Sequence, residues 1–311
     1  MAGGHWLQYV CGEMSRHIAR DITYATSAST RGGRTVIRWV ENATGRISLI
    51  RRARGYDLEV GQGRDFWQVM VDRYGLTLDV VGGSLDLIPK TGPLIVVSNH
   101  PYGILDGLMM GHILSIARGD FRILAHRVFR RAQELNRIIL PISFDGTKEA
   151  QQQNIETRKD ALAYLAQGGA IGVFPGGTVS TAPKPFGQAF DPVWRGFTAK
   201  MIAKSGATVV PIYFHGSNSR VFQMASHLHS TLRLALLIKE FRGRVDAPVR
   251  ITVGTPVPPS ELKARAGDSR ALMDFLRATT YALSPNHVGA AAYGFEFEDR
   301  YRSSNGGGRI R

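Results

Sequence analysis

The short apolar run from Leu94 to Val97 constrains the fold of this chain more than any other stretch. Gly92-Pro93 precede this Leu-Ile-Val-Val sequence, and the polar stop Asn99-His100-Pro101 follows after one serine. A run so short, so apolar and so rich in β-branched residues is typical of a strand that is buried on both faces. Such strands occur in α/β sheets, in which helices cover both sides. We therefore predict that this strand lies inside such a sheet.

Strand-like and helix-like segments alternate along the rest of the chain. Strand-like runs occupy residues 76–81, 121–126, 138–144, 170–174, 208–214 and 249–257. Helical periodicity occupies residues 64–74, 128–136, 148–167, 194–202, 227–241 and 272–283. This alternation predicts an α/β fold with a mixed, mostly parallel sheet that is flanked by helices on both faces.

We expect three segments in the domain organisation. Residues 1–63 form a helical, basic N-terminal arm, residues 64–285 form the α/β domain, and residues 286–311 form a flexible tail rich in Ser, Asn and Gly. In the arm, a predicted apolar stripe is accompanied by several arginines; it consists of Val36, Val40, Ala43, Ile47 and Ile50, with Trp39 nearby. This stripe is expected either to pack on the α/β domain or to lie on an anionic membrane surface.

The charge and the cysteine content narrow the class of protein. The net charge is +14 and the pI is about 10.2, which indicates an acidic partner such as an anionic membrane, an acidic carrier protein or nucleic acid. Cys11 is the single cysteine, so an internal disulfide and a cysteine-based zinc cluster are excluded. The single cysteine also favours a reducing compartment. No apolar window of membrane-spanning length occurs and no secretory signal is recognised, so we expect no transmembrane span.

His100 and Asp106 are the first candidate catalytic pair. His100 follows the end of the predicted strand at 94–97, and Asp106 lies where the next apolar periodic segment begins. A carboxylate on one imidazole nitrogen fixes the tautomer, so that the other nitrogen takes a proton from a hydroxyl. The alternative is that His100 caps a turn and Asp106 caps a helix, with no chemistry.

Four sequence blocks together resemble the glycerolipid (lysophospholipid) acyltransferase superfamily, in particular its bacterial hemolysin-like branch, which includes ornithine-lipid acyltransferases. The resemblance covers about residues 65–260. The first block is Asn-His, a spacer and Asp, matched by Asn99, His100 and Asp106 with a five-residue spacer where the commonest form has four. The fourth block, Val-Pro-hydrophobic, is matched by Val210-Pro211-Ile212 and borders the acyl pocket in the family.

Two blocks depart from the family pattern. The third block, Phe-Pro-Glu-Gly, is Phe174-Pro175-Gly176-Gly177-Thr178 here, with Gly176 at the glutamate. In the second block the phosphate-binding arginine is replaced by Gly146, and Lys148, Arg130 or Arg131 are candidate substitutes. These losses indicate an acceptor other than the standard glycerol phosphate. The N–H groups of Gly176, Gly177 and Thr178 are expected either to face a phosphate or oxyanion, or only to form a tight turn.

The resemblance implies direct transfer of a fatty acyl group from a thioester to a lyso-lipid, as in bacterial lipid biosynthesis, by a peripheral enzyme on the cytoplasmic side of the inner membrane. His100 would act as the general base and Asp106 would orient it, without metal or cofactor. The donor would be acyl carrier protein or acyl-coenzyme A, and no nucleic acid is expected as a partner. The predicted substrate-binding residues are Asn99, Gly103, Lys148, Arg130, Arg131, Phe174, Pro175, Gly176, Gly177, Thr178 and Pro211.

Other functions are weighed against this one. A thioesterase or lipid hydrolase is the first alternative, although the chain has no Gly-x-Ser-x-Gly nucleophile elbow. A non-catalytic membrane-surface protein of the same fold is the second, because of the replaced acceptor residues. His227 and His229 lack a matching carboxylate set for zinc, and the arginines form no recognised nucleic-acid motif. The acceptor, the acyl length, the donor and the oligomeric state are not determined by the sequence.

Overall fold

The strands of the protein form one sheet, seen here in a computed structural model that describes residues 23–25, 28, 30–126, 133–143, 147–286 and 292–297. Within these residues the sheet has seven strands in the order β1-β7-β6-β2-β5-β3-β4. The strands are β1 (Thr77–Gly82), β2 (Leu94–Ser98), β3 (Arg122–His126), β4 (Ile139–Ile142), β5 (Ala170–Val173), β6 (Thr208–Phe214) and β7 (Pro248–Val253).

Strand β2 lies at the centre of the sheet and is buried along its whole length. Leu94 and Val96 enter a core that they share with helices α5 (Phe66–Arg73), α6 (Ile104–Arg118) and α11 (Ser230–Arg242). Ile95 and Val97 enter a second core with α8 (Lys148–Ala166), α9 (Gly196–Ser205) and α13 (Ser269–Tyr281). Successive strand residues point to opposite faces, so this one run supplies both layers.

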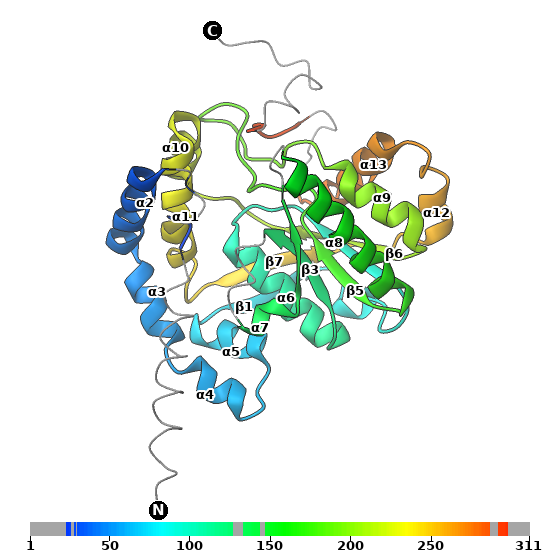
Figure 1. Cartoon of the computed structure of the whole chain (residues 1–311), viewed down its shortest axis with the longest axis horizontal. Helices are drawn as coiled ribbons and strands as arrows, with labels where there is room; N and C mark the ends of the chain where they lie inside the picture. Colours follow the sequence, from blue (N-terminus) through cyan, green and yellow to red (C-terminus); the bar gives the residue numbers. More distant parts are fainter. Residues whose placement is uncertain are drawn as a thin grey trace, which may run out of the picture.

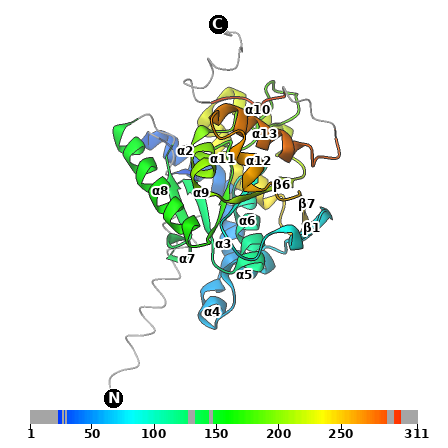
Figure 2. The same cartoon turned by 90° about the vertical axis from the view of Figure 1, so that its right-hand side faces the viewer.

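The sheet is mixed and mostly parallel. The neighbouring pairs β6–β2, β2–β5, β5–β3, β3–β4 and β1–β7 are parallel, whereas β6 and β7 are antiparallel. Figure 2 shows α8 towards one edge of the molecule and β1 with β7 towards the other. The predicted fold, a mixed sheet with helices on both faces, is therefore confirmed. Because β5 and β6 flank β2, the loops that follow these three strands meet at one edge of the sheet.

The N-terminal helices pack in two places, one on α11 and one on the core beneath the sheet. They are α2 (Arg31–Thr44), α3 (Arg46–Ala53) and α4 (Tyr56–Gly61), and α2 lies beside α11 (Figure 1). Ile37 of α2 packs on Ala235 of α11. The core that Leu94 and Val96 enter also contains Leu49, Ala53 and Tyr56. Gly45 separates α2 from α3 with φ of 134°, a backbone angle that favours glycine.

The predicted apolar stripe of the arm is largely exposed. Val36, Ala43 and Ile47 are exposed, and Trp39 is 72% exposed, while the buried positions include Ile37 and Leu49. Of the two alternatives, packing on the α/β domain therefore does not hold for these exposed side chains, because Ile37 is on the face of α2 that packs on α11.

The predicted long helix at 227–241 is two helices. Helix α10 (Arg220–Leu228) ends before His229, whose backbone is extended at φ −163° and ψ 136°. His229 then begins α11, because its side chain accepts a hydrogen bond from the N–H of Thr231. An N-cap residue in this conformation starts a new helix axis, which the continuous apolar pattern does not reveal.

The remaining described helices are α7 (Gln133–Asn136), α12 (Pro259–Lys263) and the 3₁₀ helix η2 (Leu85–Leu87). The predicted helix at 128–136 and the predicted tail at 286–311 lie mostly outside the described residues. None of the described helices combines the length and the apolarity that crossing a bilayer requires.

Candidate active site

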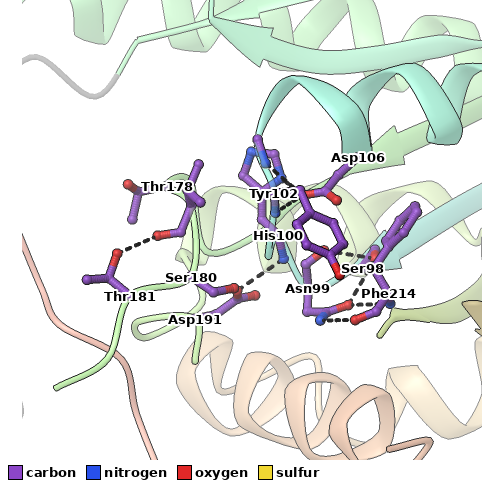
Figure 3. Close-up of polar contacts among 12 residues, drawn as sticks. Ser98, Asn99, His100, Tyr102, Asp106, Thr178, Ser180, Thr181, Asp191 and Phe214 are labelled. Carbon is purple, nitrogen blue, oxygen red and sulfur yellow. Dashed lines mark hydrogen bonds and ion pairs between the residues drawn. The ribbon is translucent and has the colours of Figure 1, made fainter. Parts of the chain in front are cut away.

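Asn99 anchors the loop that carries His100. Its side-chain oxygen accepts the N–H of Phe214 at 2.7 Å, and its amide nitrogen donates to the carbonyl of Phe214 at 2.9 Å. This pair of bonds joins the end of β2 to the last residue of β6, as Figure 3 shows. Asn99 was predicted to bind substrate, but the structure uses both polar atoms of its side chain to position the loop.

Asp106 holds the turn between His100 and α6. One carboxylate oxygen, Oδ2, accepts the N–H of Tyr102 at 2.7 Å and that of Gly103 at 2.9 Å (Figure 3). The same oxygen lies 2.9 Å from Nδ1 of His100. Gly103 precedes α6 with φ of 89°, which lets the chain absorb the five-residue spacer and still bring Asp106 back to His100.

The surroundings of the pair suit proton transfer. Asp106 is fully buried, and this burial raises the pKa of its carboxyl, while the nearby His100 ring and the two N–H donors act in the opposite direction. The His100 side chain remains 18% exposed, and its ring stacks on Phe174 with the centroids 4.3 Å apart. Because Nδ1 faces Asp106, Nε2 is the nitrogen available to an acceptor hydroxyl.

Asp191 is a site residue that the sequence analysis missed. Its buried carboxylate accepts the backbone N–H of His100 at 3.1 Å and the hydroxyl of Ser180 (Figure 3). It also accepts the indole N–H of Trp194. Ser180 in turn donates its N–H to the carbonyl of His100 at 2.8 Å. The His100 backbone is thereby tied to the loop that follows β5. An isolated Asp in the apolar stretch 190–194 was the available sequence signal.

The glycine turn after β5 is shaped by the same carboxylate. A Cβ atom on Gly176 would lie 3.3 Å from Cβ and Cγ of Asp191, so the space of a side chain at position 176 is already filled. The N–H of Gly177 donates to the carbonyl of Phe174 at 3.0 Å and is therefore used inside the turn. The N–H groups of Gly176 and Thr178 have no acceptor among the described residues.

An apolar cavity of about 410 Å³ opens beside the pair. Of the predicted site residues, those that line it are His100, Gly103, Phe174, Pro175, Gly177 and Thr178. Lys148 is exposed in the first turn of α8, and Pro211 is buried in β6 opposite Val97, so neither is among the described lining residues. Arg130 and Arg131 lie outside the described residues. Within the described chain, no cluster of His, Cys, Asp and Glu side chains is arranged to hold a metal ion.

Comparison with known proteins identifies the family. A family model described as acyltransferase matches residues 31–290, which include all seven strands and the His100–Asp106 pair. The chain belongs to this acyltransferase family. The predicted membership of the glycerolipid acyltransferase superfamily and the predicted enzyme class, an O-acyltransferase, are confirmed.

Two relatives of this acyltransferase are named lyso-glycine lipid O-acyltransferase. The protein from Phocaeicola vulgatus is 26% identical over 203 residues, which are 63% of this chain and 70% of the relative. The protein from Bacteroides thetaiotaomicron is 27% identical over 205 residues, with coverage of 63% and 71%. Among solved structures, the 1-acyl-sn-glycerophosphate acyltransferase PlsC of Thermotoga maritima is similar at 15% identity with a TM-score of 0.45, over 82% of this chain and 98% of that one.

Further polar residues line the cavity of this acyltransferase outside the four predicted blocks. Arg195 faces Glu296 through two hydrogen bonds of 2.8 and 2.9 Å, while Arg233 of α11 reaches Thr178 at 2.9 Å. Tyr24 also lines the cavity, and the carboxylate of Glu41 in α2 accepts its backbone N–H at 2.6 Å. Sequence analysis missed these residues because they come from three distant segments that meet only in the folded chain.

Proposed function

We propose that this acyltransferase moves a fatty acyl group from a thioester donor to the hydroxyl of a lyso-lipid, with His100 as general base and Asp106 as its orienting partner. The observation that carries the proposal is the 2.9 Å contact between Nδ1 of His100 and Oδ2 of Asp106 beside an apolar cavity. A buried carboxylate at this nitrogen stabilises the imidazolium that forms when the other nitrogen takes a proton.

The proposed reaction needs no acyl-enzyme. Nε2 of His100 accepts the proton of the lipid hydroxyl as the oxygen attacks the thioester carbonyl carbon. The carbonyl oxygen gains negative charge in the tetrahedral intermediate, where the N–H groups of Gly176 and Thr178 are the proposed donors. The carbon–sulfur bond then breaks, and the imidazolium returns its proton to the departing thiolate. The products are the acylated lipid and the free thiol.

The cavity supports binding of an acyl chain. Its walls include large apolar side chains of the core that Leu94 and Val96 enter, among them Trp67, Met70, Leu108 and Ile139. Mostly apolar pockets with a few polar groups near the reacting atoms are typical of sites for such ligands. A hydrocarbon chain placed here leaves its polar end near His100 and Thr178.

The proposed acceptor is a lyso-lipid with an amino-acid headgroup, and the proposed donor is acyl carrier protein or acyl-coenzyme A. The names of the two relatives support this acceptor class, as does the absence of the family's glutamate and arginine at Gly176 and Gly146. The net charge of +14 supports a donor that is acidic or carries phosphates.

The proposed place of action is the surface of an anionic bilayer, on the cytoplasmic side of the inner membrane. Val36, Trp39 and Ala43 are exposed on α2 at spacings of three and four residues, and Arg34 and Arg38 are exposed on the same helix. An exposed apolar face with arginines beside it matches the polarity and charge of such a surface. Trp39, the largest of these side chains, is the proposed membrane anchor.

Acyl transfer tests the proposal. Labelled acyl carrier protein and acyl-coenzyme A are offered with a panel of lyso-lipids, including lyso-glycine and lyso-ornithine lipids, to the wild type and to His100→Ala. The matched control is His229→Asn, which removes an exposed imidazole but keeps an N-cap side chain for α11.

Label in an acylated lipid with the wild type and the control, but not with His100→Ala, supports the proposal. Release of label only as free fatty acid favours the hydrolase instead. If the wild type and His100→Ala both bind vesicles and neither acylates any acceptor, the non-catalytic alternative is favoured.

A further inference from the structure

Arg233 is a buried cation in the wall of the cavity. It is 8% exposed, and its guanidinium lies 4.3 Å from the ring centroid of Phe297. Nη2 donates to the hydroxyl of Thr178 at 2.9 Å and to the carbonyl of Val179 at 3.0 Å. Burial lowers the pKa of Arg233 to about 10, since removal from water disfavours the charged form.

The described residues leave this charge without a counter-ion. No carboxylate among them forms an ion pair with Arg233, and its buried Nε has no hydrogen-bond partner there. Arg195, which lines the same cavity, differs because Glu296 meets both of its terminal nitrogens at 2.8 and 2.9 Å. A buried guanidinium is costly unless it is paired, so Arg233 is suited to receive an anion from outside the described chain.

Arg233 is also well placed relative to His100. The Thr178 hydroxyl to which it donates belongs to the turn that begins at Phe174, and Phe174 stacks on the His100 ring. One helical turn after Arg233, Leu237 lies 3.4 Å from the place of a Cβ on Gly103, next to the loop that holds Asp106. Residues i and i+4 share a helix face, so Arg233 and the His100 loop border the same part of the cavity.

We propose that Arg233 binds a single carboxylate at the head of the acceptor lipid and thereby directs the acceptor's hydroxyl towards His100. This assignment rests on the proposed function and specifies the acceptor as a lyso-lipid whose headgroup ends in a free carboxylate. The guanidinium N–H groups that do not donate to Thr178 and Val179 can donate charge-assisted hydrogen bonds to a carboxylate. A single positive charge that no described carboxylate pairs, in an apolar cavity, fits one negative charge better than a doubly charged phosphate.

Binding of unreactive lipid analogues tests this assignment. N-dodecanoylglycine carries the carboxylate but no acceptor hydroxyl, its methyl ester is neutral, and dodecyl phosphate carries the other anion. Titration calorimetry below their micellar concentrations gives the affinity of each for the wild type, Arg233→Met and Arg233→Lys. Arg265→Met is the matched control, because Arg265 also lies over an aromatic ring, at 4.0 Å from the centroid of Phe275, but does not line the cavity.

The wild type and Arg265→Met are expected to bind the acid at least about 10-fold more tightly than the ester, the range of a charge-assisted hydrogen bond. Arg233→Met is expected to bind the two equally, and Arg233→Lys to regain part of the preference. Equal binding of acid and ester by the wild type, or a preference retained in Arg233→Met, overturns the assignment. If dodecyl phosphate binds as tightly as the acid, the proposal that Arg233 selects a carboxylate over a phosphate is overturned.

The outcome is separable from that of acyl transfer. His100→Ala is expected to keep the preference for the acid, since the analogues undergo no reaction. A chain that prefers the acid but transfers no acyl group contradicts the proposed reaction and not the role of Arg233. If Arg233→Met does not fold, as judged by its thermal unfolding, the wild-type comparison and Arg233→Lys still decide the question.

Discussion

The carboxylate of Asp191 accepts the backbone N–H of His100 at 3.1 Å, although the two residues are 91 positions apart in the chain. The same carboxylate binds the Ser180 hydroxyl and the Trp194 indole, and the carbonyl of His100 accepts the N–H of Ser180. His100 is thus held by Asp106 at its ring and by Asp191 at its backbone. The second contact positions the base without touching any reacting atom.

Asp191→Asn is expected to lower kcat by about 10-fold or more with little change in KM, because the amide nitrogen meets the Trp194 N–H donor and the network shifts. The unfolding midpoint should fall as well. Steady-state kinetics and thermal unfolding measure the two effects. Trp194→Phe is the control, because it removes the indole N–H but leaves the bond between the Asp191 carboxylate and the His100 N–H in place. It should change kcat by only a few-fold. An equal loss in both variants contradicts a positioning role for Asp191.

His100→Ala is expected to reduce acyl transfer by ~10²- to 10⁴-fold, the usual contribution of a general base. Asp106→Asn should also reduce it strongly while the fold is kept, since an amide oxygen still accepts the two N–H groups of the turn. Initial rates at saturating donor measure the loss, and circular dichroism checks the fold. Activity of Asp106→Asn close to that of the wild type contradicts a need for the carboxylate charge beside His100.

The pH dependence of stability gives a separate test of the burial of Asp106. Burial raises its folded pKa above the unfolded value of about 3.9. At a pH between these two pKa values, the carboxyl is ionised in the unfolded chain and protonated in the folded chain. The stability that the neutral carboxyl contributes is therefore present at low pH and is lost as pH rises through the folded pKa. The unfolding free energy of the wild type minus that of Asp106→Asn should therefore decrease as pH rises above about 4. A difference that increases with pH contradicts this prediction.

Gly103→Ala is expected to destabilise the fold by about 1–2 kcal/mol and to lower activity, because φ of 89° disfavours a Cβ atom. That atom would also lie 3.3 Å from a methyl group of Val179. Urea unfolding measures the change. Gly107→Ala, in the same helix with no atom within 4 Å of the new Cβ, should be neutral or slightly stabilising; the same loss in both variants points to the helix in general and not to the turn.

Trp39→Ala is expected to weaken binding to anionic vesicles by about 10-fold or more, since burial of one large apolar side chain contributes about 1.5–3 kcal/mol. Sedimentation with phosphatidylglycerol vesicles measures it. Val81→Ala is the comparison, because Val81 is also exposed but lies on β1. Unchanged sedimentation of Trp39→Ala contradicts the proposed membrane anchor.

The order of strands and helices, the buried central strand and the first catalytic candidates follow from the sequence. Local patterns carry that information: an apolar run of four residues predicts a two-sided strand, and His100 and Asp106 are close enough in the chain to meet across one turn. The contact between them depends on Gly103, whose freedom of φ is also a local property.

Tertiary structure alone decided the rest. Which face of α2 is exposed depends on its packing against α11, and the separation of α10 from α11 depends on the extended backbone of His229. Asp191 and Arg233 reach the site from segments far along the chain, and sequence periodicity says nothing about which distant side chains will meet. The sequence by itself therefore determined the sheet and the pair of residues at its edge, while the fold decided what holds that pair in place and which charge faces the cavity.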